Sequence, residues 1–335
     1  MIQSIEQVNQ SKNLIEELRN LVKEDWVSMN KEIQDQLHSD IGLINSISHY
    51  IINSGGKRLR PLIVLLAYRA CGKNNNQESI KAAAMIEFIH TATLLHDDVV
   101  DDSATRRGTI TAHKNFGNES TILVGDFLYS RAFQIMVEIG HMRIMEIMSE
   151  ATNTIAEGEV MQLINCGNPD TTKEQYLEVI YRKTAKLFAS AATIGGVLAG
   201  QSNKIEDSLN IYGQELGMAY QLIDDALDYS SSYEMMGKEM GDDLSEGKPT
   251  LPLIYALERA NPEMQMIIRD AITKKDASHC NEIIDCIEQT GSLALTESKA
   301  RESSIKAIEA LKQLPNNQYK EALISLAEFT VNRPF

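Results

Sequence analysis

Apolar positions recur every three to four residues along almost the whole chain, and strand-like alternation is rare. This period predicts helices of roughly 10–25 residues, separated by clusters rich in Gly, Pro, Asn and Ser. The predicted breaks are residues 54–56, 72–79, 117–118, 167–170, 201–207, 230–248, 261–262, 274–278 and 315–317. No break is long and polar enough to mark a domain boundary. We therefore expect one all-α domain over residues 1–335.

Residues 230–248 are the main exception to the helical period. They hold three glycines, several acidic residues, Lys238 and Lys248. Two interpretations fit this composition: a mobile surface loop, or a lid whose lysines fold over a bound anion. We favour the lid, because the segment directly follows an acidic cluster.

Composition narrows the class of protein. The chain has 335 residues, of which 43% are hydrophobic, which suits a globular protein with a sizeable core. Its formal net charge of −15 argues against a nucleic-acid partner. Any anion pocket must therefore be built from locally concentrated Lys and Arg side chains.

Cysteine usage and hydropathy indicate a cytoplasmic protein. The four cysteines match no zinc spacing, and we interpret them as reduced thiols: Cys71, Cys166, Cys280 and Cys286. The first residues have neither the basic start nor the apolar stretch of a signal peptide. The longest low-charge run, residues 187–201, is too short for a transmembrane anchor. It contains Gly195 and Gly196, which predict a buried helix that allows close backbone approach.

Two acidic clusters of the form DDxxD stand out, Asp97–Asp101 and Asp224–Asp228. Each follows an apolar run, and in a helix the first and last aspartate lie one turn apart on one face. Like charges at this spacing repel and are costly to bury, so the clusters require a cation. Carboxylate oxygens suit hard divalent ions, and Mg²⁺ is commonly completed by substrate phosphates.

A single cluster of this form is most often a solvated helix face or a capping group. Two copies, both in apolar context and both followed by basic residues, favour a metal site that handles phosphate. Neither copy is an EF-hand, because the glycine and the distal glutamate of that loop are missing.

Basic residues concentrate in two short runs beside glycines, Gly55–Pro61 and Arg106–Gly108. Such runs are usually solvated surface. In an acidic protein, glycines and cations at a helix start favour a phosphate site instead, because backbone amides and arginine forks bind anions there.

The motifs follow one another in the order GGKRLRP, FIHTATLLHDDVVDDSATRRG, YRKTAKLF, YQLIDDALDY and GKEMGDDLSEGKPTLPL. In this order, and over residues 40–330, the chain resembles the trans-polyprenyl diphosphate synthases. The resemblance implies an isoprenoid-synthase-type bundle of antiparallel helices around a deep central cavity, and a homodimer. It also implies an enzyme that condenses isopentenyl diphosphate, repeatedly and head to tail, onto an allylic diphosphate such as farnesyl diphosphate.

The same resemblance implies roles for individual residues. About three Mg²⁺ ions would bridge the allylic diphosphate to the two clusters. Their main ligands would be Asp97, Asp101 and Asp224, supported by Asp98, Asp225 and Asp228. The allylic diphosphate would be bound by Arg106, Lys183 and Lys238, and isopentenyl diphosphate by Lys57, Arg60, His90 and Arg107. Thr184 and Gln221 would line the reacting carbons, and Lys248 would assist the departing pyrophosphate.

The implied chemistry needs no protein nucleophile. An allylic C–O bond breaks to leave a carbocation and pyrophosphate, and metal ions with Lys and Arg stabilise the leaving charge. An apolar, water-poor cavity protects the cation. The absence of a Ser-His-Asp or Cys-His pattern is therefore expected.

The two histidines before the first cluster receive different interpretations. His90 lies two helical turns before Asp97 and nearly on the same face, so it can look into the same cavity. His96 directly precedes Asp97, points elsewhere and is interpreted as structural. The pair resembles the HD signature of metal phosphohydrolases, but no further histidine ligands accompany the second cluster.

Small residues one turn below the first cluster predict a long product. Ala92 and Thr93 occupy positions where short-chain relatives carry bulky aromatics, so a growing tail can pass them. Ile89 and, on a later helix, Met136 are candidates for the deeper wall or floor, although ordinary core packing explains each of them as well. Each isoprene unit needs about 5 Å of depth. We predict a product of about C40, with roughly C35–C50 requiring only a shifted floor.

Two other classes of protein compete with this interpretation. A class I terpene cyclase shares the first acidic motif, but it usually has an Asn/Ser/Glu-type second motif and no second-substrate site. A non-catalytic partner subunit typically loses acidic or basic motif residues, and this chain has lost none.

The lipid product is expected to serve as a quinone side chain, which would involve only transient membrane association.

Overall fold

The computed structural model describes residues 13–74, 76–106, 108–230 and 241–332. Within these ranges the only β structure is a short antiparallel ribbon of β1 (Thr105–Arg106) and β2 (Thr109–Ile110). The remaining elements are helices, so the predicted all-α class and helical-bundle fold are confirmed.

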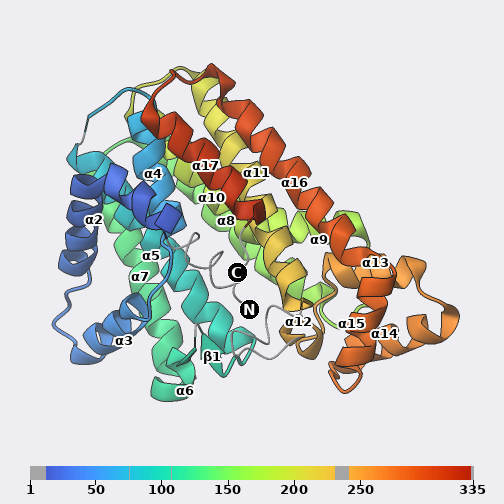
Figure 1. The fold of residues 1–335 in the computed structure, drawn as a ribbon. Helices are drawn as coiled ribbons and strands as arrows, with labels where there is room; N and C mark the ends of the chain where they lie inside the picture. The colour runs from blue at the N-terminus through green and yellow to red at the C-terminus, as the bar shows by residue number, and fades with distance from the viewer. Residues whose placement is uncertain (1–12, 75, 107, 231–240, 333–335) are drawn as a thin grey trace.

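The helices form a bundle whose long members run side by side through the middle of the molecule (Figure 1). A helix over residues 13–21 is followed by α2 (Lys23–Gln36), α3 (Gly42–Asn53), α4 (Leu59–Ala70), α5 (Gln77–Val100), α6 (Ala112–Phe116), α7 (Asn118–Ile139) and α8 (Met142–Asn165). Next come α9 (Lys173–Ile180), the π-helical turn η1 (Tyr181–Ala185), α10 (Lys186–Leu198), α11 (Asn203–Asp228) and α12 (Asp242–Ser245). The chain then forms α13 (Leu251–Arg259), α14 (Pro262–Lys274), α15 (Cys280–Gln289), α16 (Ser292–Ala310), the short η3 (Leu311–Gln313) and α17 (Gln318–Asn332).

Helix α10 lies at the centre of the core, packed against α4 on one side and α11 on another. Nearly all its residues are buried, as predicted for the low-charge run. Glycines permit the close approach. A Cβ at Gly195 would lie 2.7 Å from the Cβ of Ala67 on α4, and one at Gly213 on α11 would lie 2.4 Å from the carbonyl oxygen of Phe188. Small residues therefore determine how closely these three helices pack.

Both acidic clusters stand at the carboxyl ends of their helices. Helix α5 is capped at its start by Asn76, whose side chain accepts a hydrogen bond from the Ser79 amide, and it ends at the first cluster. Helix α11 ends at Asp228. The carboxyl end of a helix carries a partial negative charge. Carboxylates placed there add to that charge, which strengthens the requirement for a nearby cation.

No helix in the described ranges is long and apolar enough to cross a membrane. All four cysteines are free thiols, in agreement with the prediction.

Candidate active site

The carboxyl ends of α5 and α11 line one cavity of about 720 Å³. A side pocket of about 230 Å³ shares part of this wall and extends toward α12 and α13. The charged residues around the two hollows are Lys57, Arg60, Asp97, Asp101, Arg106, Glu159, Lys183, Asp224, Asp225, Asp228, Asp242, Asp243, Glu246 and Lys248. The fold thus gathers most of the sequence-predicted residues at one place.

In the first acidic cluster, Asp97 and Asp101 line the hollows but Asp98 does not. Asp98 is fully buried and accepts a hydrogen bond from Nε of Arg106 at 2.6 Å. Burial raises the pKa of Asp98, although the neighbouring guanidinium opposes the shift. Adjacent helical residues point about 100° apart, so Asp98 faces away from Asp97. In this structure Asp98 anchors Arg106, and its role as a supporting metal ligand stays a prediction.

The second acidic cluster presents all three carboxylates to the cavity. Asp225 accepts hydrogen bonds from Oη of Tyr176 at 2.6 Å and from Nε2 of Gln221 at 2.8 Å. Asp228 accepts one from the backbone amide of Asp243 at 3.1 Å. Burial raises the pKa of Asp225 to about 6 and that of Asp228 to about 7. A bound cation would counter this effect and keep both groups ionised.

Two lysines lie against the first cluster. Nζ of Lys183 is 3.5 Å from Oδ2 of Asp97 and 2.6 Å from Oε2 of Glu159, and Nζ of Lys248 is 2.9 Å from Oδ2 of Asp101. Burial alone would lower the pKa of both lysines, but the surrounding carboxylates outweigh burial and raise it. The acidic wall therefore carries its own counter-charges.

Thr184 and Gln221 lie side by side on the cavity wall. Oγ1 of Thr184 donates a hydrogen bond to Oε1 of Gln221 at 2.9 Å. Thr184 and Lys183 both belong to η1, and Gly158 on α8 allows this turn to pack closely. A Cβ at Gly158 would lie 2.7 Å from the Cβ of Arg182 and 2.9 Å from the backbone nitrogen of Lys183. A single π-helical turn often marks a functional site, and here it directs two consecutive polar residues into the cavity.

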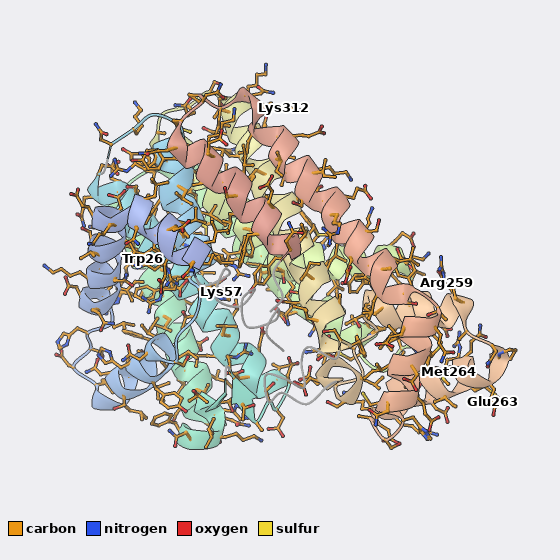
Figure 2. The ribbon with its side chains drawn as sticks, in the orientation of Figure 1. Trp26, Lys57, Arg259, Glu263, Met264 and Lys312 are labelled. Atoms are coloured by element: carbon orange, nitrogen blue, oxygen red, sulfur yellow. The ribbon has the colours of Figure 1, made fainter. Side chains whose placement is uncertain are left out.

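Lys57, Arg60 and His90 form another part of the wall. Nη1 of Arg60 lies 3.1 Å from Nε2 of His90, and its guanidinium lies 4.4 Å from the centroid of the Phe188 ring. Figure 2 shows Lys57 where the N-terminal helices meet the middle of the molecule, far from Arg259 at the opposite edge. The structure thus brings the first basic run and the predicted histidine to the cavity that holds the acidic clusters.

Two predicted site residues, Arg107 and Lys238, lie outside the described residues. So does most of the predicted lid, residues 231–240. Its described end forms α12 and leads to Lys248, which contacts the first acidic cluster.

The sequence interpretation missed several acidic residues of the wall. Glu159 lies on α8 and pairs with Lys183, and Asp242, Asp243 and Glu246 belong to the second half of the predicted lid. The pair of aspartates within the lid could have been suspected, because that segment is rich in acidic residues. Glu159 belongs to no recognised motif, and its role becomes visible only when α8 packs on η1.

An apolar cavity of about 260 Å³ adjoins the large one beside Asp97. Its wall consists of Ile89, Thr93, His96, Asp97, Val100, Tyr129, Thr152, Ile155, Ala156 and Glu159. Two of the four predicted tunnel residues, Ile89 and Thr93, therefore line it. Ala92 and Met136 are buried in the core and do not line this cavity, so their place in the tunnel stays a prediction.

His96 contacts α7, as a structural histidine would. Its Nε2 lies 3.4 Å from Oδ1 of Asp126 and 3.2 Å from the carbonyl oxygen of Ile122. Gly125 makes room for the ring, because a Cβ there would lie 2.3 Å from Nε2. His96 also lines the apolar cavity, which the sequence did not predict.

Acidic and basic groups thus share one cavity, and an apolar cavity opens beside them. This arrangement accommodates a diphosphate head and a hydrocarbon tail in adjoining spaces. An all-helical bundle with two acidic helix ends at such a cavity defines the class of isoprenoid synthases.

Comparison with known proteins specifies the family. Residues 42–290 match the family model for polyprenyl synthetase. The octaprenyl diphosphate synthase of Escherichia coli (strain K12) is 50% identical over 320 residues, covering 95% of this chain and 99% of that protein. The octaprenyl diphosphate synthase of Haemophilus influenzae is 45% identical over 324 residues, covering 96% and 98%. The chain belongs to the polyprenyl synthetase family, and it is a prenyltransferase.

A solved structure supports the same assignment. The polyprenyl synthase of Caulobacter crescentus, complexed with calcium and isoprenyl diphosphate, superimposes with a TM-score of 0.91. It is 42% identical, and the match covers 96% of this chain and 98% of that one. Enzymes of this family use Mg²⁺.

Proposed function

We propose that this enzyme is an all-trans-octaprenyl diphosphate synthase that extends an allylic diphosphate with isopentenyl diphosphate, for use as a quinone side chain. The observation that carries the proposal is the junction at Asp97, where a cavity with acidic and basic walls adjoins an apolar cavity beside Ile89 and Thr93. Close relatives that cover nearly the whole chain bear the same name.

The acidic walls fit Mg²⁺ by their chemistry. Asp97 and Asp101, at the end of α5, line the side pocket, and Asp97 with Asp224 and Asp228 on α11 lines the large cavity that shares its wall. Among the described residues, no three His, Cys, Asp or Glu side chains form a ready-made metal site. Mg²⁺ usually takes one or two carboxylates and is completed by water and phosphate oxygens. We therefore propose that about three ions bind between these walls and the allylic diphosphate.

The basic residues divide between the two diphosphates in this proposal. Lys183, Lys248 and Arg106 lie near the first acidic cluster and would bind the allylic diphosphate, together with Lys238. Lys57, Arg60 and His90 would bind isopentenyl diphosphate, together with Arg107. Mg²⁺, when bound, would supply Lewis-acid stabilisation of charge on the leaving pyrophosphate.

Thr184 and Gln221 would lie beside the reacting carbons. Their hydrogen bond fixes two polar groups that stabilise positive charge without attacking it as nucleophiles. The apolar cavity would receive the growing tail and exclude water from the allylic cation. Tyr129 and Thr152 line this cavity, so we propose that they form part of the wall that the growing tail contacts.

Helix α7 offers a surface for the homodimer that the family resemblance implies. Leu123, Phe133 and Val137 lie within one face of the helix and are 66%, 36% and 66% exposed. Apolar side chains gathered on one exposed face indicate an interaction surface. We propose that a second copy covers it through a twofold interface. The test is the mass of the particle in solution, with Leu123→Asp and Val137→Asp together expected to yield monomers.

A product assay tests the proposed reaction. Purified protein, Mg²⁺, farnesyl diphosphate and labelled isopentenyl diphosphate should yield a product of about C40, measured by chromatography. A product of about C15–C20 would retain the chemistry but contradict the chain length. If the complete chain incorporates no isopentenyl diphosphate in the presence of Mg²⁺, the proposal is wrong.

A further inference from the structure

The turn that carries Lys57 and Arg60 has an unusual backbone. Gly55 and Gly56 have φ angles of 87° and 133°, and Arg58 has φ 44° and ψ 48°, the left-handed helical region. Residues with a Cβ adopt this region at an energetic cost, and such strain persists only where the surroundings enforce it. The neighbours of Arg58 should therefore explain why it is held there.

Arg58 turns away from the cavity that its neighbours Lys57 and Arg60 line. Its guanidinium donates hydrogen bonds to Oδ1 of Asn30 and, at 3.1 Å, to the carbonyl oxygen of Ile52. Its Nε lies 3.6 Å from Oε1 of Glu87, whose side chain is only 9% exposed. This one side chain thus links the turn to α2, α3 and α5.

A second arginine holds the same turn from outside. Nη2 of Arg19 donates a hydrogen bond to the carbonyl oxygen of Lys57 at 2.8 Å and approaches that of Gly56 at 3.3 Å. Its guanidinium lies 4.7 Å from the ring centroid of Trp26, which Figure 2 labels on α2. Two guanidinium groups therefore fix the backbone on the side of the turn away from the cavity.

Glu87, which contacts Arg58, lies on the same helix as two residues of the candidate active site. It lies on α5, one turn before His90 and ten residues before Asp97. His90 in turn lies 3.1 Å from Arg60. Helix α5 thus carries the first acidic cluster at its end. Earlier along the same helix, Glu87 contacts Arg58 and His90 contacts Arg60.

We propose that Arg58 and Glu87, with Arg19, act as positioning residues that direct Lys57 and Arg60 toward isopentenyl diphosphate. The inference rests on the proposed function, because it assumes that Lys57 and Arg60 bind that substrate. It goes further in assigning a role to three residues that do not touch substrate. Their effect should fall on the second substrate and spare the allylic one, whose proposed ligands Lys183, Lys248 and Arg106 pair instead with carboxylates of the first acidic cluster.

The chain offers a matched control. Arg69, at the other end of α4, makes a buried ion pair with Asp25 on α2, with Nε and Oδ2 2.7 Å apart. This pair resembles Arg58–Glu87 in burial and also links α4 to a neighbouring helix, but neither residue lines the cavity. A contribution to stability alone would be common to both pairs, whereas positioning would be specific to Arg58 and Glu87.

The experiment is steady-state kinetics of the complete enzyme, with each substrate varied while the other is saturating. Arg58→Ala should raise the KM for isopentenyl diphosphate about tenfold or more, because small misplacements of binding groups are costly. The KM for the allylic diphosphate should stay within about twofold. Arg58→Asn tolerates the left-handed backbone but lacks the guanidinium, so it should give the same shift. Glu87→Gln should give a smaller rise, and Asp25→Asn should give none.

Several outcomes would overturn the inference. One is an unchanged KM for isopentenyl diphosphate in both Arg58→Asn and Glu87→Gln, which covers the case in which Arg58→Ala does not fold. Others are equal rises for both substrates, or the same rise in Asp25→Asn. These outcomes differ from failure of the proposed function, in which the unaltered enzyme would not incorporate isopentenyl diphosphate at all and the inference would fall with it.

Discussion

Among the described residues, Asp97 alone lines the large cavity, the side pocket and the apolar cavity. Its carboxylate lies 3.5 Å from the ammonium group of Lys183, at the end of α5. A ligand with a charged head in the large cavity and an apolar tail in the apolar cavity would therefore have the junction between head and tail beside Asp97. The first two predictions concern this position and the residue one turn before it.

Asp97→Ala should lower kcat about 100-fold or more, because it removes a charged group from the place where leaving-group charge develops. The thermal midpoint should change little, since the side chain faces a cavity. The control is Asp102→Asn: Asp102 is 76% exposed and pairs with Lys114 away from the cavity. Near-normal turnover in Asp97→Ala, measured with saturating substrates, would remove Asp97 from the metal site.

Thr93→Tyr should shorten the product while sparing the first condensation. Thr93 lines the apolar cavity one turn before Asp97, so a ring there would fill space that the tail would occupy. Product length is measured by chromatography, and Thr93→Ser serves as the control that keeps the space open. An unchanged length in Thr93→Tyr would contradict the tunnel. Ala92→Tyr is the poorer test, because Ala92 is fully buried and a larger residue would disturb the core.

The sequence predicts the chemistry of the site better than the direction of each side chain. The spacing of Asp97 and Asp101 places them on one helical face, and the structure finds both at the hollows. Asp98 and Ala92 each neighbour a lining residue, but one step along a helix turns the side chain by about 100°. Which face of α5 lines the cavity depends on how the helix packs against its neighbours, and the spacing of residues within one helix does not reveal this.

Among the elements, η1 illustrates how packing controls the site. Its π-helical turn presents Lys183 and Thr184 together, and Gly158 lets α8 press against it. The close contact brings Glu159 within 2.6 Å of Lys183. The third prediction tests this contact.

Gly158→Val should destabilise the protein by about 1–3 kcal/mol and lower kcat, because the added atoms overlap the backbone of η1 and displace Lys183 and Thr184. Gly42→Ala is the matched control. A Cβ there meets nothing within 4 Å, and alanine is favoured over glycine in a helix. Melting curves and steady-state rates measure both effects. A Gly158→Val enzyme with unchanged kcat would show that the position of η1 does not matter for catalysis.

The helix boundaries were predictable where polar or proline-rich clusters mark them. The breaks at residues 54–56, 117–118 and 261–262 coincide with observed helix ends. The break predicted at 201–207 is too long, because α11 already begins at Asn203. The break between α7 and α8 was missed. There a single left-handed Gly140 ends α7, followed only by His141 before α8, and no polar cluster marks the break.

On the scale of the whole molecule, an acidic protein gathers buried acidic groups at its centre. Burial raises the pKa of Glu159 and Asp228 to about 7 and that of Asp225 to about 6. In the unfolded chain the same groups titrate near their ordinary values, about 4. Between these values the folded protein holds protons that the unfolded chain has released. Stability contributed by these groups therefore falls as pH rises from about 4 to about 7.

The fourth prediction follows from that sign. Without divalent cations, the thermal midpoint should be higher at about pH 5 than at about pH 7.5. Asp228→Asn should reduce the difference, because the substituted side chain does not titrate. Differential scanning calorimetry in the presence of a chelator measures both proteins. A midpoint that is constant or rises over this range would contradict the raised pKa values.

Lys183 and Lys248 already neutralise part of the first acidic cluster, and this has a consequence for how ligands enter. A metal ion that arrives alone competes with ammonium groups for Asp97 and Asp101, and a diphosphate that arrives alone meets carboxylates. With both present, Asp97 and Asp101 would hold the ions, and Lys183 and Lys248 would be released to contact phosphate oxygens. Metal and diphosphate should therefore bind with positive cooperativity, and by thermodynamic linkage each should raise the affinity of the other by the same factor.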